Sequence, residues 1–201
     1  MFARKHFVAR SVQLAALALV LVLGLTGCAS MVSSKEELQS LGENEGIVVG
    51  SFVINVEKGE EKESGLAFLA GRKSGDSSYG VSIAERSASA AVNPFKTNYR
   101  FEVKPEQEFA FLKKLPAGTY QVHEIKQLGF SNLFVNLTVN FTVRPKQTTY
   151  IGRLTVQFPD RVRAYSQIRT RVTDAQEETI NSLRKEYGDS VFSNVAKELM
   201  R

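Results

Sequence analysis

The sequence predicts a mainly β chain, an antiparallel β-sandwich followed by C-terminal α-helices, with a small open barrel as the alternative. Three observations lead to this prediction. Apolar and polar residues alternate in short stretches between positions 46 and 172, as in strands with one buried face. Turn-forming residues separate these stretches. After Val172 the apolar spacing changes to that of an amphipathic helix.

The N-terminal segment has the order of an export signal. Arg4, Lys5 and Arg10 precede an apolar run of 12 residues from Leu14 to Leu25. Spanning a membrane takes about 20 apolar residues. The short run therefore predicts a signal peptide over residues 1–27 that is removed from the mature protein. An uncleaved anchor is the alternative.

The end of this run resembles the lipobox of bacterial lipoproteins. It reads Leu25-Thr26-Gly27-Cys28 and ends on the only cysteine of the chain. The resemblance implies cleavage before Cys28 and lipidation of Cys28, with several acyl chains attaching the protein to the membrane. Because a single acyl chain gives only marginal attachment, several chains are needed for stable anchoring. The alternative is an unmodified, buried cysteine near the end of an ordinary cleaved signal peptide.

The residues after the cysteine bear on the location. Ala29 and Ser30 stand where lipoproteins retained in the inner membrane often carry an aspartate. The resemblance therefore implies the cell envelope, at the periplasmic face of the outer membrane. Residues 28–45 are mostly small, polar or charged, and we interpret them as an acylated, flexible tether.

Cleavage also changes the charge of the chain. The signal holds three of the 26 basic residues and none of the 21 acidic ones, so the mature chain has 23 bases, 21 acids and a net charge of +2. This balance argues against nucleic acid as a partner. A second cysteine is missing from the sequence, so an intrachain disulfide is excluded.

Residues 46–172 are expected to form one β-sandwich domain. Its clearest strand has apolar residues at every odd position from Leu133 to Val143. Because the linkers are short, we expect consecutive strands to be antiparallel neighbours. The expected strands cover residues 46–56, 65–70, 79–84, 99–103, 108–115, 118–126, 133–143, 148–158 and 161–172.

One turn in this region resembles a known family. Residues 115–122 read Leu-Pro-Ala-Gly-Thr-Tyr-Gln-Val, a form common in transthyretin-like and carboxypeptidase-regulatory-like sandwiches. Pro116 would set the turn, Gly118 would permit unusual backbone angles, and Tyr120 and Val122 would point inward. The segment from Val143 to Gly152 is similar to a hairpin of uncharacterised bacterial lipoproteins with such domains. The resemblance implies a transthyretin-like or Ig-like fold, and it implies no activity.

Residues 173–201 are expected to be helical. Asp174 and Glu177 have the spacing of a capping box, and Gly188 would end the first helix. A second helix is expected from Asp189 to Arg201. Both apolar stripes would pack on the sandwich, although the last helix could instead dock a partner protein.

Catalytic, cofactor and metal motifs are missing from the sequence. His123 is the only histidine of the mature chain, and we expect it to share a strand face with Gln121 and Ile125. One histidine and an acylated cysteine do not make a zinc site. A nucleophile elbow and a phosphate-binding loop are also missing. We therefore expect a protein that is not an enzyme and that has no cofactor and no metal.

One strip of residues suggests a binding surface. In the strand expected over 161–172, alternate positions carry Arg161, Arg163, Tyr165, Arg169 and Arg171. Their guanidinium groups could bind phosphate or carboxylate groups of envelope lipid, glycan or acidic protein. The alternative is a solvated face whose arginines pair with acids across the sheet.

These observations favour a noncatalytic, membrane-anchored binding or accessory module. The alternatives are a structural subunit of an envelope complex, held through residues 189–201, and a hydrolase with an unrecognised site.

Overall fold

The computed structural model describes residues 32–57, 78–86, 95–128, 134–158 and 168–201. The chain is mainly β, as predicted. Its elements in chain order are α2 (Lys35–Gln39), β1 (Glu45–Val56), β2 (Tyr79–Arg86), β3 (Phe95–Val103), β4 (Glu108–Pro116), β5 (Gly118–Gln127), β6 (Phe134–Val143), β7 (Thr148–Phe158), β8 (Arg169–Thr173), α4 (Gln176–Tyr187), the 3-10 turn η2 (Ser190–Phe192) and β9 (Val195–Lys197).

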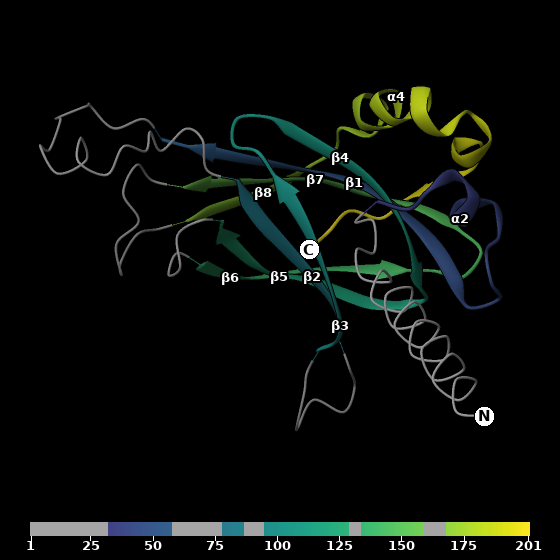
Figure 1. Ribbon diagram of the computed structural model, residues 1–201, viewed down its shortest axis with the longest axis horizontal. Helices are drawn as coiled ribbons and strands as arrows, with labels where there is room; N and C mark the ends of the chain where they lie inside the picture. Colours follow the sequence, from purple (N-terminus) through teal and green to yellow (C-terminus); the bar gives the residue numbers. More distant parts are fainter. Residues whose placement is uncertain (1–31, 58–77, 87–94, 129–133, 159–167) are drawn as a thin grey trace, which may run out of the picture. The chain divides into compact units, whose positions relative to one another are not determined.

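The strands form two sheets (Figure 1). Sheet A has the order β4-β1-β7-β8, with β9 also paired to β7, and sheet B has the order β3-β2-β5-β6. Most neighbouring strands are antiparallel, but β1 and β9 each run parallel to β7. The strand expected over 65–70 and the first part of the one expected over 161–172 lie outside the described residues.

The expectation that consecutive strands are antiparallel neighbours holds for β2–β3, β5–β6 and β7–β8, but three short connections cross between the sheets instead. Residues 104–107, residue 117 and residues 144–147 each carry the chain from one sheet to the other. Glu106 and Lys146 have φ angles of 59° and 54°, which turn the chain between the layers. Backbone bonds hold both turns: Glu106 N donates to Ile54 O at 2.8 Å and Lys146 N to Glu45 O at 2.7 Å.

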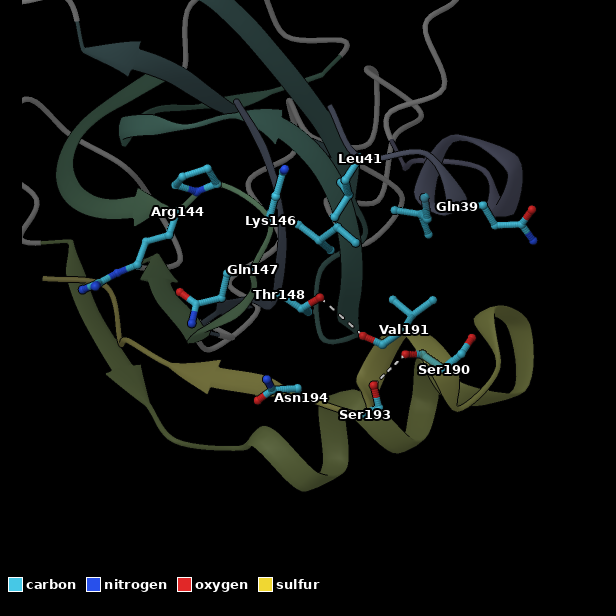
Figure 2. A pocket seen from close by; sticks show the side chains of 13 residues that line it. Gln39, Leu41, Arg144, Lys146, Gln147, Thr148, Ser190, Val191, Ser193 and Asn194 are labelled. Carbon is cyan, nitrogen blue, oxygen red and sulfur yellow. Dashed lines mark hydrogen bonds between the residues drawn. The ribbon is translucent and has the colours of Figure 1, made fainter. Parts of the chain in front are cut away.

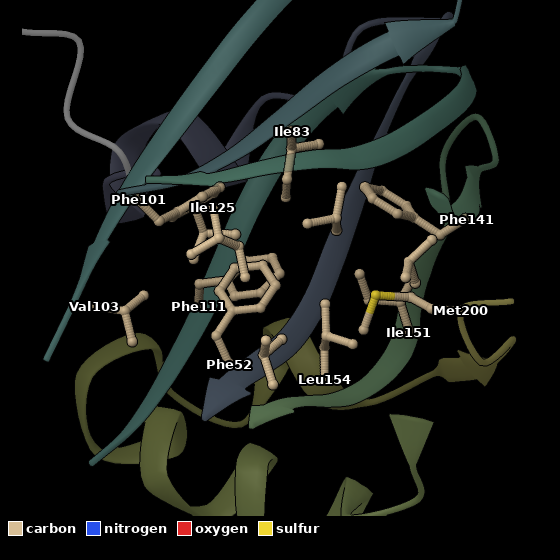
Figure 3. Packing of buried hydrophobic residues seen from close by; sticks show 14 of the residues in the cluster. Phe52, Ile83, Phe101, Val103, Phe111, Ile125, Phe141, Ile151, Leu154 and Met200 are labelled. Atoms are coloured by element: carbon tan, nitrogen blue, oxygen red, sulfur yellow. The ribbon is translucent and has the colours of Figure 1, made fainter. Parts of the chain in front are cut away.

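The main core lies between the sheets (Figure 3). Phe52 and Phe111 of sheet A stack with ring centroids 4.8 Å apart, and Phe101 of sheet B lies 4.9 Å from Phe111. Such aromatic pairs add about 0.5 to 1.5 kcal/mol each beyond their area burial. In β6 the expected register is confirmed, because Val139 and Phe141 are buried in this core.

A second apolar cluster covers the opposite face of sheet A. Val49, Leu112 and Tyr150 of the sheet pack there against side chains from α2, α4 and η2. Strand β1 is therefore buried on both faces over much of its length. Its first residues accordingly form a continuous apolar run instead of a strict alternation.

The last 13 residues form no α-helix, so the second helix expected from Asp189 to Arg201 is wrong. After η2, strand β9 pairs with the start of β7, and Met200 N donates to Ile151 O at 2.9 Å. Met200 is 3% exposed and belongs to the core between the sheets. The free edge of β7 satisfies these backbone groups, and this tertiary pairing overrides the helical spacing.

The first C-terminal helix forms, with a different start. Its N-cap is Ala175, and the capping box expected from Asp174 and Glu177 is missing. Asp174 Oδ1 instead accepts a bond from Gln176 N at 3.2 Å. Ile180, Leu183 and Tyr187 are buried as expected. Gly188 ends the helix with a φ of 81°.

Residues 32–45 also differ from the expected flexible tether. Ser34 and Glu37 form a capping box at the start of α2, and Leu38 is 6% exposed in the second cluster. Ser33 is bound to the edge of β4: its N donates to Leu112 O at 3.1 Å, and its Oγ accepts from Lys114 N at 3.0 Å. This segment is therefore part of the folded domain, because its few apolar side chains pack on the apolar face of sheet A.

Candidate functional site

The predicted lipidation site, Cys28, lies outside the described residues, which begin at Val32. Its acylation stays a prediction. In the described ranges, none of the helices is long and apolar enough to cross a membrane.

Part of the arginine strip lies on β8. Arg161, Arg163 and Tyr165 lie outside the described residues, whereas Arg169 and Arg171 stand opposite Gln157 and Thr155 of β7. Both arginines are exposed. Ile168 and Val172 point the other way and pack against the core between the sheets.

Neither Arg169 nor Arg171 forms an ion pair with a residue that the structure describes. The contrast on the same sheet is Arg153, one strand inward. Its guanidinium donates to both carboxylate oxygens of Glu108, at 3.0 and 2.8 Å, and to Glu178 at 2.6 Å. Arg153 thus fastens α4 to the sheet and leaves those acids engaged. Among the described residues, the two β8 guanidinium groups have no acidic partner of this kind.

Buried hydroxyls complete the attachment of α4. Ser51 Oγ lies 3.4 Å from Thr179 Oγ1, and both residues are fully buried. Tyr150 Oη accepts a bond from Ala175 N at 2.8 Å. Burial raises the pKa of Tyr150 above its ordinary value. These hydrogen bonds join α4 to sheet A, so we assign their residues a role in stability.

A groove of about 690 Å³ lies at the end of sheet A where β1 and β7 begin (Figure 2). Residues 32–45, the docked segment, form one wall through Leu38 and Gln39, and η2 lies on the other side. Three separate parts of the chain build it, so the sequence carries no local signal for it. Its lining consists of Leu38, Gln39, Leu41, Ile47, Arg144, Pro145, Lys146, Gln147, Thr148, Ser190, Val191, Ser193 and Asn194.

The groove is lined by basic side chains and by side chains that form hydrogen bonds. Arg144 and Lys146 are its charged residues, and none of its lining residues is acidic. Arg144 is held by Glu198 through bonds of 3.1 and 2.9 Å, whereas Lys146 is exposed on a strained turn. Figure 2 shows the hydroxyl of Thr148 bonded to Val191 O at 3.4 Å and that of Ser193 bonded to Ser190 O at 3.0 Å.

His123 occupies a bulge in β5, which corrects its expected surroundings. The pairing of β5 with both neighbours shifts between Val122 and Glu124. The extra residue resets the alternation, so Val122 and Ile125 both face the core. Ile125 therefore does not share the face expected for Gln121 and His123. Burial lowers the pKa of His123, and Glu124 acts in the opposite direction. Within the described ranges, three or more metal-ligating side chains are nowhere grouped to hold an ion.

Gly118 also differs from expectation. Its φ angle is not positive. A Cβ added there would lie 3.6 Å from its nearest neighbour, Glu85 Oε1, which is an ordinary van der Waals contact. The position does not require a glycine conformation. The inward direction of Tyr120 and Val122 is confirmed by their complete burial.

The comparisons with known proteins add little. No family model and no curated protein match this chain. Among solved structures, the chain is similar to a leucine-rich repeat protein from Bacteroides thetaiotaomicron. The identity is 17% and the TM-score 0.32, over 60% of this chain and 15% of that one. The match spans a small part of that protein's length, and a similarity this slight indicates neither fold nor function.

Proposed function

We propose that this protein is a lipoprotein of the cell envelope, acylated on Cys28, whose folded domain is a noncatalytic binding module at the periplasmic face of the outer membrane. Its anchor is supported by the sequence Leu25-Thr26-Gly27-Cys28, at the end of an apolar run too short to span a bilayer. Ala29 and Ser30 support the outer membrane over the inner one.

The anchor is tested by lipid labelling of the full chain. Cys28→Ser removes the sulfur that would carry the first acyl chain, so we expect loss of labelling by a palmitate analogue and accumulation of an uncleaved precursor. Ser30→Ala is the matched control and should be labelled and cleaved normally. Normal labelling of the Cys28→Ser protein would show that the anchor is elsewhere.

The binding surface of the module is the edge of sheet A that holds β8. The observation that carries this proposal is that Arg169 and Arg171 are exposed on an edge strand and make no ion pair with a described residue. Guanidinium forks bind phosphate and carboxylate groups in two-pronged geometry. Peptidoglycan, whose stem peptides carry several carboxylate groups, is the periplasmic ligand that best fits two neighbouring arginines.

Co-sedimentation with peptidoglycan at low salt tests this surface. Arg169→Gln with Arg171→Gln should weaken binding at least several-fold and leave the melting temperature nearly unchanged, because exposed charges contribute about 0 to 1 kcal/mol each. Added salt should mimic the change, since exposed attractions are screened. Arg184→Gln with Lys185→Gln removes the same charge from α4 and serves as the control. Equal binding by both double variants would exclude β8 as the surface.

We further propose that the two-sheet arrangement is a transthyretin-like sandwich. Supporting this is the turn between β4 and β5, where Tyr120 Oη donates to Pro116 O at 2.9 Å and Tyr120 is fully buried. A crystal structure of the mature chain, compared strand by strand with transthyretin-like domains, would test it. The earlier alternative of a partner docked on a C-terminal helix is not retained, since residues 195–201 form β9 and core contacts instead.

A further inference from the structure

The segment that follows the expected lipid anchor is fixed to the folded domain. Ser33 is bound to Leu112 and Lys114 of β4, and Leu38 is buried against sheet A. Lys114 adds a bond from its Nζ to Ser40 O at 3.2 Å. The chain is therefore held on the domain from residue 33 onward, and the free length of any tether is set by the residues before it.

That free length is short. Val32 is four residues after Cys28, and an extended chain covers at most about 3.6 Å per residue, or roughly 14 Å over these four steps. A lipid chain on Cys28 therefore keeps Val32 within roughly 14 Å of the membrane surface. The docked segment is also one wall of the groove, through Leu38, Gln39 and Leu41.

The groove and the arginine edge lie at opposite ends of sheet A. The groove includes Ile47 and Thr148, where β1 and β7 begin. The partners of Arg171 and Arg169 are Thr155 and Gln157, seven and nine residues farther along β7 than Thr148. At about 3.3 Å per strand residue, this places them about 23 to 30 Å from the groove end.

From these placements we propose that the α2 side of the domain stands against the membrane and that the groove binds the anionic headgroups of phospholipids there. The proposal rests on acylation of Cys28. Lys146 supplies the main positive charge, and Arg144 adds a guanidinium that Glu198 partly neutralises. The side-chain amides of Gln39, Gln147 and Asn194 can donate hydrogen bonds to phosphate oxygens. The same orientation leaves the arginine edge directed away from the lipid, toward other envelope components.

Site-specific quenching in vesicles tests this orientation. Acylation leaves Cys28 without a thiol, so a single introduced cysteine accepts a fluorophore. Gln39→Cys places the fluorophore on the groove wall, and Thr170→Cys places it on β8 beside the arginines; both residues are exposed. The acylated full chain is reconstituted in vesicles of phosphatidylethanolamine and phosphatidylglycerol that carry a nitroxide headgroup quencher.

We expect the probe at position 39 to be quenched several-fold more strongly than the probe at position 170. Vesicles without phosphatidylglycerol should reduce the quenching at position 39, and so should Lys146→Gln with Arg144→Gln. Arg184→Gln with Lys185→Gln is the charge-matched control and should leave it unchanged. Melting temperatures of all variants verify that the domain remains folded.

Three results would overturn the proposal. A chain that does not float with the vesicles would disprove the acylated anchor and this orientation together. A chain that floats but shows equal quenching at both positions, or stronger quenching at position 170, would disprove the orientation alone. Strong quenching at position 39 that ignores both phosphatidylglycerol and the Lys146 and Arg144 substitutions would disprove headgroup binding in the groove.

Discussion

At the scale of the residue, the alternation in β6 decides which side chains carry the stability of the domain. Phe141 is 4% exposed and stacks on Tyr120 with a centroid distance of 5.6 Å. Its neighbour Asn140 uses only backbone groups in its bonds with Arg201. The side chain of Phe141 therefore contributes packing that the side chain of Asn140 does not.

We expect Phe141→Ala to lower the free energy of unfolding by about 3 to 5 kcal/mol, because it removes a buried aromatic ring and leaves a cavity. Asn140→Ala, the matched control, should have a much smaller effect. Chemical denaturation of both variants measures the difference. Equal unfolding midpoints would contradict the register described for β6.

The pKa of Asp174 depends mainly on one contact, with Lys197. Lys197 Nζ lies 2.6 Å from its Oδ2, and this hydrogen bond is the main cause that lowers the pKa of Asp174 below its ordinary value. A lowered carboxyl pKa means that the contact contributes stability above the unfolded-state pKa of about 3.9 and loses it as pH falls through the folded-state value.

Lys197→Gln should therefore raise the pKa of Asp174 toward the ordinary value. Carbon-detected NMR titration of the side-chain carboxyl group measures this directly. Lys185→Gln removes a charge from α4 without touching Asp174 and should leave its titration unchanged. An unaltered Asp174 titration in the Lys197→Gln protein would show that this ion pair does not form in solution.

At the scale of the element, β7 depends on a glycine bulge. Its pairing with β1 shifts between Val49 and Ser51, and Gly152 has a φ of 99°. Tyr150 faces the second cluster before the bulge, and Leu154 faces the core after it. If residues 150–154 alternated strictly, without the bulge, Arg153 would point toward the core and Leu154 away from it.

Gly152→Ala should lower the free energy of unfolding by more than about 1 kcal/mol, because an L-residue is strained at this φ. The added Cβ would also lie 2.9 Å from Val172 Cγ1 and 3.3 Å from Thr173 O. Gly118→Ala is the control, since the surrounding atoms leave ordinary van der Waals space there. Thermal unfolding of the two variants checks the prediction, which equal melting temperatures would refute.

The edge strand β4 carries a feature that alternation alone does not reveal. Lys113 is 8% exposed, between Phe111 and Leu115 on the inward face of the strand. Its Nζ lies 5.8 Å from the centre of the Tyr99 ring. Burial lowers the pKa of Lys113 below its ordinary value. An inward-facing cation at a sheet edge discourages the edge from pairing with another chain.

At the scale of the whole molecule, the last residues connect the two sheets. Met200 N donates to Ile151 O in sheet A, at 2.9 Å. Arg201 exchanges backbone bonds of 2.6 and 2.9 Å with Asn140 in sheet B. The side chain of Met200 fills the core between them (Figure 3).

Met200→Ala should therefore lower the free energy of unfolding by about 2 to 5 kcal/mol, as expected for truncation of a buried methionine. Arg201→Ala keeps the backbone bonds and removes only an exposed side chain, so it is the control. Denaturant unfolding followed by circular dichroism measures both. A Met200→Ala protein as stable as the control would mean that the C-terminal segment is not part of the core.

The sequence by itself determined the properties that depend on local spacing. The period-two pattern identified the strands from β1 to β7 and the inward direction of Phe141, because a pleated strand alternates its faces wherever it is placed. The helical spacing of Ile180, Leu183 and Tyr187 identified α4 in the same way. Gly188, just after those residues, predicted the end of α4 correctly.

The tertiary structure alone decided which distant segments meet. The parallel pairing of β1 with β7, the docking of α2 on sheet A and the capture of residues 195–201 by the edge of β7 each satisfy groups that lie far apart in sequence. The groove follows from the same contacts, since α2, the turn at Lys146 and η2 come together only when the sheets form. A free strand edge must pair its backbone groups, and an apolar side chain must be covered, but many partners can meet either need. The local spacing of residues does not specify which distant segment becomes the partner.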